Sequence, residues 1–317
     1  MTSFLKYIIL SITMTAICYG QNAGTAGAFA RMGFGARGMS MGNALTAVTT
    51  GDISTYYNPA VSAFSENRRA AATFGFLSLD RYLNFLSYTQ AIKPTAGLSA
   101  GIINAGVNKI DGRDRSGTRT EEYSTYENQF YLAFSNRVDK RVSLGVAVKL
   151  YHSKLFDEVK STTVGFDVGV CVQILDGLFT GLTIQDIGSK YNWDTKPLYS
   201  DPTAGKTVIE KFPTLRRIGV AYSLPNGMGL VSVDYENSTQ KTSILRAGAE
   251  YNFMEYFSVR SGIDRLEFGE NATGVKPSFG FTAKKSLGEW TPAVSYAYIF
   301  ESFAPRGIHI ITLSTTF

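Results

Sequence analysis

The residues that could do chemistry in this 317-residue chain are few and scattered. The sequence has two histidines, His152 and His309, and two cysteines, Cys18 and Cys171. Ser153 follows His152, but consecutive residues of a strand face opposite sides, so this serine is a poor nucleophile partner. So few His and Cys residues also argue against a metal site. We therefore expect no enzymatic activity, no metal and no cofactor.

One glycine-rich segment matches a cofactor-binding pattern. Residues 33–38 have the G-x-G-x-x-G spacing of dinucleotide-binding turns. That fingerprint works after a strand, where it opens the helix of a βαβ unit, whereas this one follows an apolar leader. A segment that must turn tightly inside or beside a barrel explains the glycines better.

The first twenty residues have the three parts of a secretory signal. Lys6 gives the positive start, residues 7–16 are apolar, and small residues precede Gln21. We predict a signal peptide over 1–20; a lipoprotein signal at Cys18 is the weaker alternative, because bulky Ile17 precedes it. Without Lys6, 30 basic residues face 26 acidic ones, a net charge of about +4. That mild surplus indicates no nucleic-acid partner.

From Arg69 onward, segments of about ten residues alternate apolar with small or polar side chains, which is typical of strands. Short and long connections alternate between them, as in outer-membrane barrels. We predict an all-β fold: a transmembrane outer-membrane β-barrel of about fourteen antiparallel strands over 69–317, preceded by a short helical or irregular plug-like segment over 21–68. The predicted strands are 69–78, 81–91, 96–106, 127–137, 141–153, 162–174, 178–187, 215–223, 228–236, 243–252, 256–266, 274–283, 290–300 and 307–317.

Placing the apolar faces in lipid turns a set of charged side chains toward the lumen. Because consecutive strands carry several of them, we expect cross-strand ion pairs that brace the wall or anchor a plug rather than select a solute. These residues are Asp167, Arg217, Asp234, Glu236, Arg246, Glu250, Arg260 and Asp264. Large apolar residues for a lipid-binding lumen are expected mainly from Leu77, Leu79, Leu86 and Tyr88.

Aromatic residues suggest two further roles. Those expected in interfacial girdles are Tyr131, Tyr222, Tyr251, Tyr296, Tyr298 and Phe300. Two long outer loops, 107–126 and 188–214, are candidate partner surfaces; the second carries Tyr191, Trp193, Tyr199 and Phe212. Long outer loops also occur in barrels that have no partner. The terminal Phe317 ends the last strand and resembles the C-terminal signal that barrel-assembly machinery reads.

The segment from Ala28 to Ala60 resembles the N-terminal signature of the PorV/PorQ group, within the wider FadL-like outer-membrane barrels. It combines a glycine-rich approach, a small amphipathic helix and an Asn-Pro-Ala corner in fixed order. The residues that carry the likeness are Gly33, Gly35, Arg37, Gly38, Met41, Gly42, Ala44, Asn58, Pro59 and Ala60. Over the rest of the chain the likeness is architectural.

The resemblance implies two alternative functions. PorV-like proteins serve type IX protein secretion, which implies secreted cargo proteins and translocon subunits as partners, together with outer-membrane lipid. FadL-like proteins instead carry hydrophobic small molecules, with an N-terminal hatch and a lateral opening in the wall. The secretion role is the leading hypothesis and the hydrophobic channel is the alternative.

Overall fold

The computed structural model is a closed antiparallel β-barrel of fourteen strands. It describes residues 24–51, 54–156, 158–199, 201, 203–267, 274–302 and 304–317, so the predicted signal peptide lies outside the described residues. Each barrel strand pairs with its neighbour in the chain, except that β7 (Leu178–Ile187) pairs with β10 (Leu215–Ser223), and β1 (Arg69–Phe76) closes the barrel against β16 (Ile308–Thr316). In the described part, no helix is both long and apolar enough to cross a membrane.

The barrel strands match all fourteen predicted segments. They are β1 (Arg69–Phe76), β2 (Arg81–Ile92), β3 (Ala96–Arg113), β4 (Arg119–Asp139), β5 (Val142–Lys154), β6 (Lys160–Leu175), β7 (Leu178–Ile187), β10 (Leu215–Ser223), β11 (Gly229–Ser238), β12 (Ser243–Met254), β13 (Phe257–Glu267), β14 (Lys276–Lys284), β15 (Thr291–Ile299) and β16 (Ile308–Thr316). Period-two alternation located them because each strand has one face in lipid and one in the lumen.

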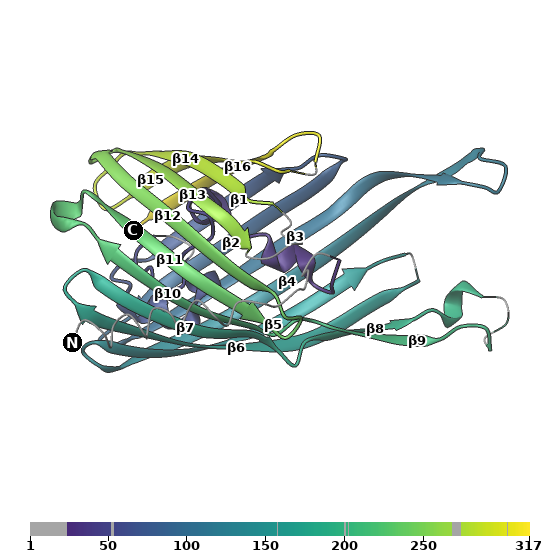
Figure 1. Cartoon of the computed structure of the whole chain (residues 1–317), viewed down its shortest axis with the longest axis horizontal. Coiled ribbons are helices and arrows are strands. Elements are labelled where there is room, and N and C mark those ends of the chain that lie inside the picture. Colours follow the sequence, from purple (N-terminus) through teal and green to yellow (C-terminus); the bar gives the residue numbers. More distant parts are fainter. Residues whose placement is uncertain are drawn as a thin grey trace, which may run out of the picture.

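The two regions expected to be long loops are more regular than predicted. Most of 107–126 continues β3 and β4 as a hairpin that projects beyond the barrel, and 188–214 holds the two-stranded sheet of β8 (Lys190–Asp194) and β9 (Thr207–Lys211). Both project to the right in Figure 1, whereas the short turns gather at the left. The ends of β3 and β4 that extend outward are largely exposed, and β8 and β9 have only five residues each, so apolar alternation did not reveal these elements. We call the end with the short turns the inner end and the other the outer end.

The facing of several side chains differs from expectation. Leu79, expected inside, lies in the turn before β2 and is 71% exposed. Leu86 is 54% exposed and Tyr88 also lies on the lipid face, whereas Leu83 and Phe85 point inward. Tyr131, expected in a girdle, is only 5% exposed inside the barrel. Because successive residues alternate, a one-residue error in the parity of a weakly patterned strand inverts its whole face.

A plug of short helices lies within the barrel, drawn in purple in Figure 1. Its elements are η1 (Ala28–Arg31), α2 (Gly35–Ser40), α3 (Ser54–Tyr57) and η2 (Pro59–Phe64). Phe34, Met41 and Leu45 of the plug are fully buried. A fourteen-stranded barrel is wider than its own side chains can fill, and the plug occupies that space.

Wall glycines allow η2 to lie directly on the backbone of the strands. A Cβ atom on Gly145 of β5 would lie 2.4 Å from the backbone nitrogen of Ala60, and one on Gly169 of β6 would lie 2.0 Å from Oδ1 of Asn58. Ser143 of β5 also donates a hydrogen bond of 2.8 Å to the carbonyl of Ala60. The inner end of the plug is therefore fitted to this wall.

We predict that Gly145→Val loosens η2 without preventing barrel formation. The added side chain displaces the backbone of Ala60, an overpacking cost of about 1–3 kcal/mol, so cleavage of the plug at Phe64 becomes about tenfold faster. Limited chymotrypsin digestion measures this rate. Val146→Leu, which enlarges the lipid-facing neighbour, is the control; equal cleavage in the two variants would show that η2 does not depend on this contact.

Candidate functional site

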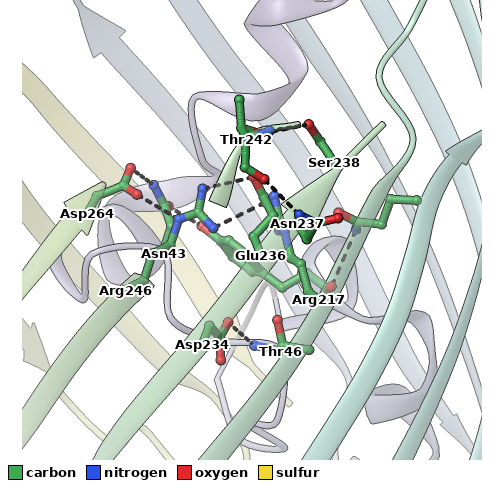
Figure 2. A network of polar contacts seen from close by, with 12 residues as sticks. Asn43, Thr46, Arg217, Asp234, Glu236, Asn237, Ser238, Thr242, Arg246 and Asp264 are labelled. Atoms are coloured by element: carbon green, nitrogen blue, oxygen red, sulfur yellow. Dashed lines mark hydrogen bonds and ion pairs between the residues drawn. The ribbon is translucent and has the colours of Figure 1, made fainter. Parts of the chain in front are cut away.

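A ladder of paired charges runs along the lumen face of β10 to β13. Glu236 accepts hydrogen bonds from Arg217 at 2.5 Å and Arg246 at 3.1 Å, and Arg246 Nε reaches Asp264 Oδ1 at 2.6 Å (Figure 2). Arg217 lies directly opposite Glu236 in the adjacent strand, whereas Arg246 lies opposite Asp234 and reaches Glu236 diagonally, two residues further along β11. All these side chains are buried. The ladder therefore pairs buried charge rather than exposing it to a solute.

The plug supplies further partners for the same ladder. Asn43 donates through Nδ2 to Asp264 at 3.1 Å, and the backbone N–H of Thr46 donates to Asp234 at 2.9 Å. Figure 2 shows both contacts beside Arg246. These hydrogen bonds to carboxylates are the stronger, charge-assisted kind. The charged wall consequently fixes residues 43–46 of the plug.

A second cluster joins α2 to the wall nearer the inner end. Glu250 of β12 accepts from Arg37 at 2.8 and 3.0 Å and from Arg260 of β13 at 2.5 Å. Arg37 also donates to the carbonyl of Thr50, and this hydrogen bond joins the two ends of plug residues 37–50. One carboxylate thus bridges the plug and two adjacent strands.

The remaining predicted lumen charge, Asp167, belongs to a separate cluster. Lys149 contacts Asp167 at 2.7 Å and Asp186 at 3.0 Å, and the hydroxyl of Tyr151 donates to Asp186 at 2.5 Å. Lys149 and Tyr151 share the inward face of β5, and Lys149 is a lumen charge that the predicted set does not contain. Asp186 could not be placed in the same way, because it lies at a backbone irregularity with a φ of 61°.

The opposite side of the lumen is apolar. The ring of Phe34 lies 4.9 Å from Tyr56 within the plug, 4.5 Å from Phe85 of β2 and 6.2 Å from Tyr131 of β4, measured between ring centroids. The same cluster includes Leu83, Ile103 and Ala133 of the wall. We call this the apolar sector, and the side formed by β10 to β13 the charged sector.

The motif residues shape the backbone of the plug. Gly33, Gly35 and Gly42 have φ angles of 117°, 70° and 61°, which favour glycine. A Cβ on Gly42 would also lie 2.5 Å from the carbonyl oxygen of Ile263 on β13. Gly38 lies under the ring of Tyr57, so most of these glycines serve turns and close contacts.

The rest of the motif joins plug segments to each other and to the wall. Asn58 caps η2 by accepting from the backbone of Ala60 at 3.0 Å, and its Nδ2 donates to the carbonyls of Thr46 at 2.9 Å and Val170 at 3.1 Å. Met41 packs on Gly248 and Gly262 of the wall. The other buried motif residues are Ala44 and Pro59.

Aromatic residues close the outer mouth over the plug. Phe212 packs on Tyr151 and Tyr191 with centroid distances of 4.8 Å each, and Tyr191 lies 4.8 Å from Trp193. The three loop aromatics are buried, and only Tyr199 of the four expected at a partner surface is exposed. The prediction that these aromatics face a partner is therefore wrong for three of them: they cover the plug instead.

The wall of the barrel is continuous beside the apolar sector. From Ala96 to Val107, β3 pairs residue by residue with both β2 and β4, and register shifts occur only beyond Val107. The lateral opening implied by the FadL-like resemblance is absent from these described strands. A shallow apolar groove of about 680 Å³ does cross the outer face of this wall, where Ala70, Ala72 and Ala100 lie between larger neighbours.

At the inner end, the last residue completes the barrel closure. Phe317 and Arg68 exchange two backbone hydrogen bonds of 3.0 Å, and the ring of Phe317 stacks on Trp290 at 4.8 Å. This contact continues the pairing of β16 with β1 to the end of the chain.

We predict that Glu236→Gln strongly destabilises the protein. The variant leaves Arg217 and Arg246 buried without their shared carboxylate, which costs about 3–5 kcal/mol. Chemical unfolding in detergent measures the loss, with Glu255→Gln in an exposed inner turn as the control. Equal unfolding midpoints for the two variants would contradict a stabilising role for the ladder.

No protein-family model and no curated protein matches this chain. Solved structures do match its fold. The toluene transporter TodX of Pseudomonas putida superposes with a TM-score of 0.62 at 12% identity, over 90% of this chain and 96% of TodX. A Pseudomonas aeruginosa FadL homologue gives 0.63 at 12% identity, over 90% and 98%. The monoaromatic hydrocarbon channel CymD gives 0.62 at 14%, over 90% and 97%. The chain therefore has the fold of the FadL-like outer-membrane channels.

Proposed function

We propose that this protein is an outer-membrane channel for hydrophobic small molecules, whose route runs along the apolar sector. The observation that carries the proposal is the division of the lumen. On one side the plug is held by charged groups; on the other, Phe34, which stacks on Tyr56 within the plug, contacts the rings of Phe85 and Tyr131 in the wall.

The free energy needed to separate the plug from the wall differs between the charged sector and the apolar sector. Separating the plug from the charged sector strands buried ionic groups, at several kcal/mol each. In the apolar sector, a hydrophobic solute would replace the contacts between rings with similar apolar contacts of its own. The hydrogen bond between the hydroxyl groups of Thr55 and Ser99, 2.8 Å long, joins neutral groups, so breaking it costs less than breaking an ion pair. A small shift of residues 29–34 and 54–57 would therefore open an apolar path while the charged anchors stay in place.

The proposal favours the alternative of the two sequence-based hypotheses. TodX and CymD, which share the fold, are described as a toluene transporter and a monoaromatic hydrocarbon channel, and this supports the channel reading. Burial of Tyr191, Trp193 and Phe212 leaves Tyr199 as the one exposed aromatic residue of the four expected in loop 188–214, which weakens the case for partner binding there. The PorV/PorQ likeness and a role in type IX secretion stay predictions.

We also infer that the protein is not an enzyme. His152 contacts the hydroxyl of Thr162 at 2.8 Å, and His309 contacts the hydroxyl of Tyr296 at 2.8 Å. Neither arrangement is that of a nucleophile activated by a histidine that a carboxylate orients. Both contacts are cross-strand pairs that suit the outer ends of barrel strands.

Tethering the plug tests the proposed route. Thr55 and Ser99 have hydroxyl oxygens 2.8 Å apart, so Thr55→Cys with Ser99→Cys places two thiols in position to join α3 to β3. We expect cells with the oxidised variant to accumulate radiolabelled toluene at the rate of cells lacking the protein, and reduction to restore uptake.

The control links two wall strands and leaves the plug free. Thr282 and Ser295 of β14 and β15 are 2.5 Å apart between hydroxyl oxygens, so the same pair of cysteine substitutions suits them. Uptake by this variant should not respond to oxidation. The proposal is wrong if the native protein gives no uptake above cells that lack it, or if the Thr55–Ser99 tether leaves uptake unchanged.

A further inference from the structure

We propose that a cavity at the inner end of the barrel, the inner vestibule, binds an oxyanion: the phosphate or carboxylate group of a solute or lipid. The cavity has a volume of about 490 Å³ and lies between the plug and strands β11 to β16, with β1 at its edge. That size suits a small ligand. The site is separate from the hydrophobic route, which follows the other side of the plug.

Positive charge dominates the lining of the vestibule. Arg37 of the plug faces it together with Arg69, Arg260 and Lys284 of the wall, whereas Glu250 is the one carboxylate among the described lining residues. Counting Asp52 as well, which follows Gly51 of the lining in the sequence, would still set four cations against two carboxylates. A concave surface with charge of one sign concentrates ions of the opposite sign.

Two of the lining cations share one carboxylate. Glu250 accepts from Arg37 at 2.8 Å and from Arg260 at 2.5 Å, which fixes both guanidinium groups at the cavity wall. Arg260 is buried, and its Nη1 donates to Thr282 at 2.7 Å. Guanidinium groups fixed in this way are the usual partners of phosphate and carboxylate groups.

Neutral hydrogen-bonding groups complete the site. Buried hydroxyl groups from four neighbouring strands line the same wall, and a hydroxyl can donate to an anion without adding charge. These residues are Ser258, Thr282, Ser295 and Thr312. Large apolar side chains are scarce here, with Leu224 and Leu230 the largest in the lining. The lining thus suits a polar anion rather than a hydrocarbon.

The position of the vestibule indicates which molecules reach it. η2 covers β5 and β6 at the inner end, where Gly145 and Gly169 bring it onto the wall. Beside β11 to β16 the plug leaves the cavity, which is bordered by the inner turn at Leu224 and Gly227. An anion on the periplasmic side of the membrane would therefore enter from the inner end without displacing η2.

The first test titrates inorganic phosphate into the purified full-length protein in non-ionic detergent, with binding followed by calorimetry. We expect one saturable site per barrel. Lys284→Gln and Arg69→Gln should each weaken binding about tenfold, the equivalent of about 1.4 kcal/mol. Heat-modifiable migration on gels checks that each variant folds as a barrel.

Lys285→Gln is the matched control. Lys285 is exposed, follows Lys284 directly and does not line the cavity, so this variant removes the same charge without changing the site. The proposal is wrong if no saturable binding is found up to about 10 mM phosphate, a concentration that would occupy about 90% of a site with a Kd of about 1 mM. Equal weakening by Lys285→Gln and Lys284→Gln would also overturn it, because net charge alone would then explain the binding.

A second arm identifies the source of the oxyanion. The protein is placed in nanodiscs of phosphatidylcholine with or without phosphatidylglycerol, and the phosphate titration is repeated. If a lipid headgroup occupies the vestibule, phosphatidylglycerol competes with phosphate and weakens phosphate binding to the native chain. In Lys284→Gln, phosphatidylglycerol should then weaken phosphate binding no further. Unchanged phosphate affinity assigns the site to a free solute anion. Either result supports the site. Phosphate binding is measured without toluene uptake, so its result does not depend on whether the proposed hydrophobic route exists.

Discussion

Buried charge in the lumen is the constraint on which the rest of this structure depends. The wall of β10 to β13 carries buried arginines and carboxylates where the plug packs against it, and each must find a partner there. Cross-strand register supplies most partners, and Asn43, Thr46 and Arg37 of the plug supply the rest. The plug is thus part of the electrostatic balance of the barrel wall.

The same constraint explains why the lumen has two chemically different sides. Directional ionic contacts in the charged sector set the position of the plug. The apolar sector of the wall therefore needs only to match the shape of the plug. Phe34 illustrates this: its ring contacts Phe85 and Tyr131 without a directional bond to either. A hydrophobic solute competes with contacts of that kind far more readily than with an ion pair. Transport and anchoring are thereby separated across the width of one barrel.

Much of the barrel could be predicted from the sequence, because each strand divides its side chains between lipid and lumen. The same rule identified the inward charges of β10 to β13. It could not say what fills the lumen, so the burial of Tyr191, Trp193 and Phe212 over the plug was missed. Asp186 was missed because a backbone irregularity interrupts the alternation there. The parity of β2 was inverted, since small and large residues follow each other with little pattern in that strand.

The inner vestibule and the plug anchor share their cationic groups, and this links them energetically. Arg37 and Arg260 hold Glu250 and also line the vestibule. An anion that draws either guanidinium away from Glu250 weakens the hold of α2 on the wall, whereas one that bridges Arg37 and Arg260 while both keep their contact with Glu250 strengthens it. By thermodynamic reciprocity, whatever moves α2 changes the affinity for the anion by the same factor. Because α2 directly follows Phe34, the state of the inner end bears on the contacts that close the apolar sector.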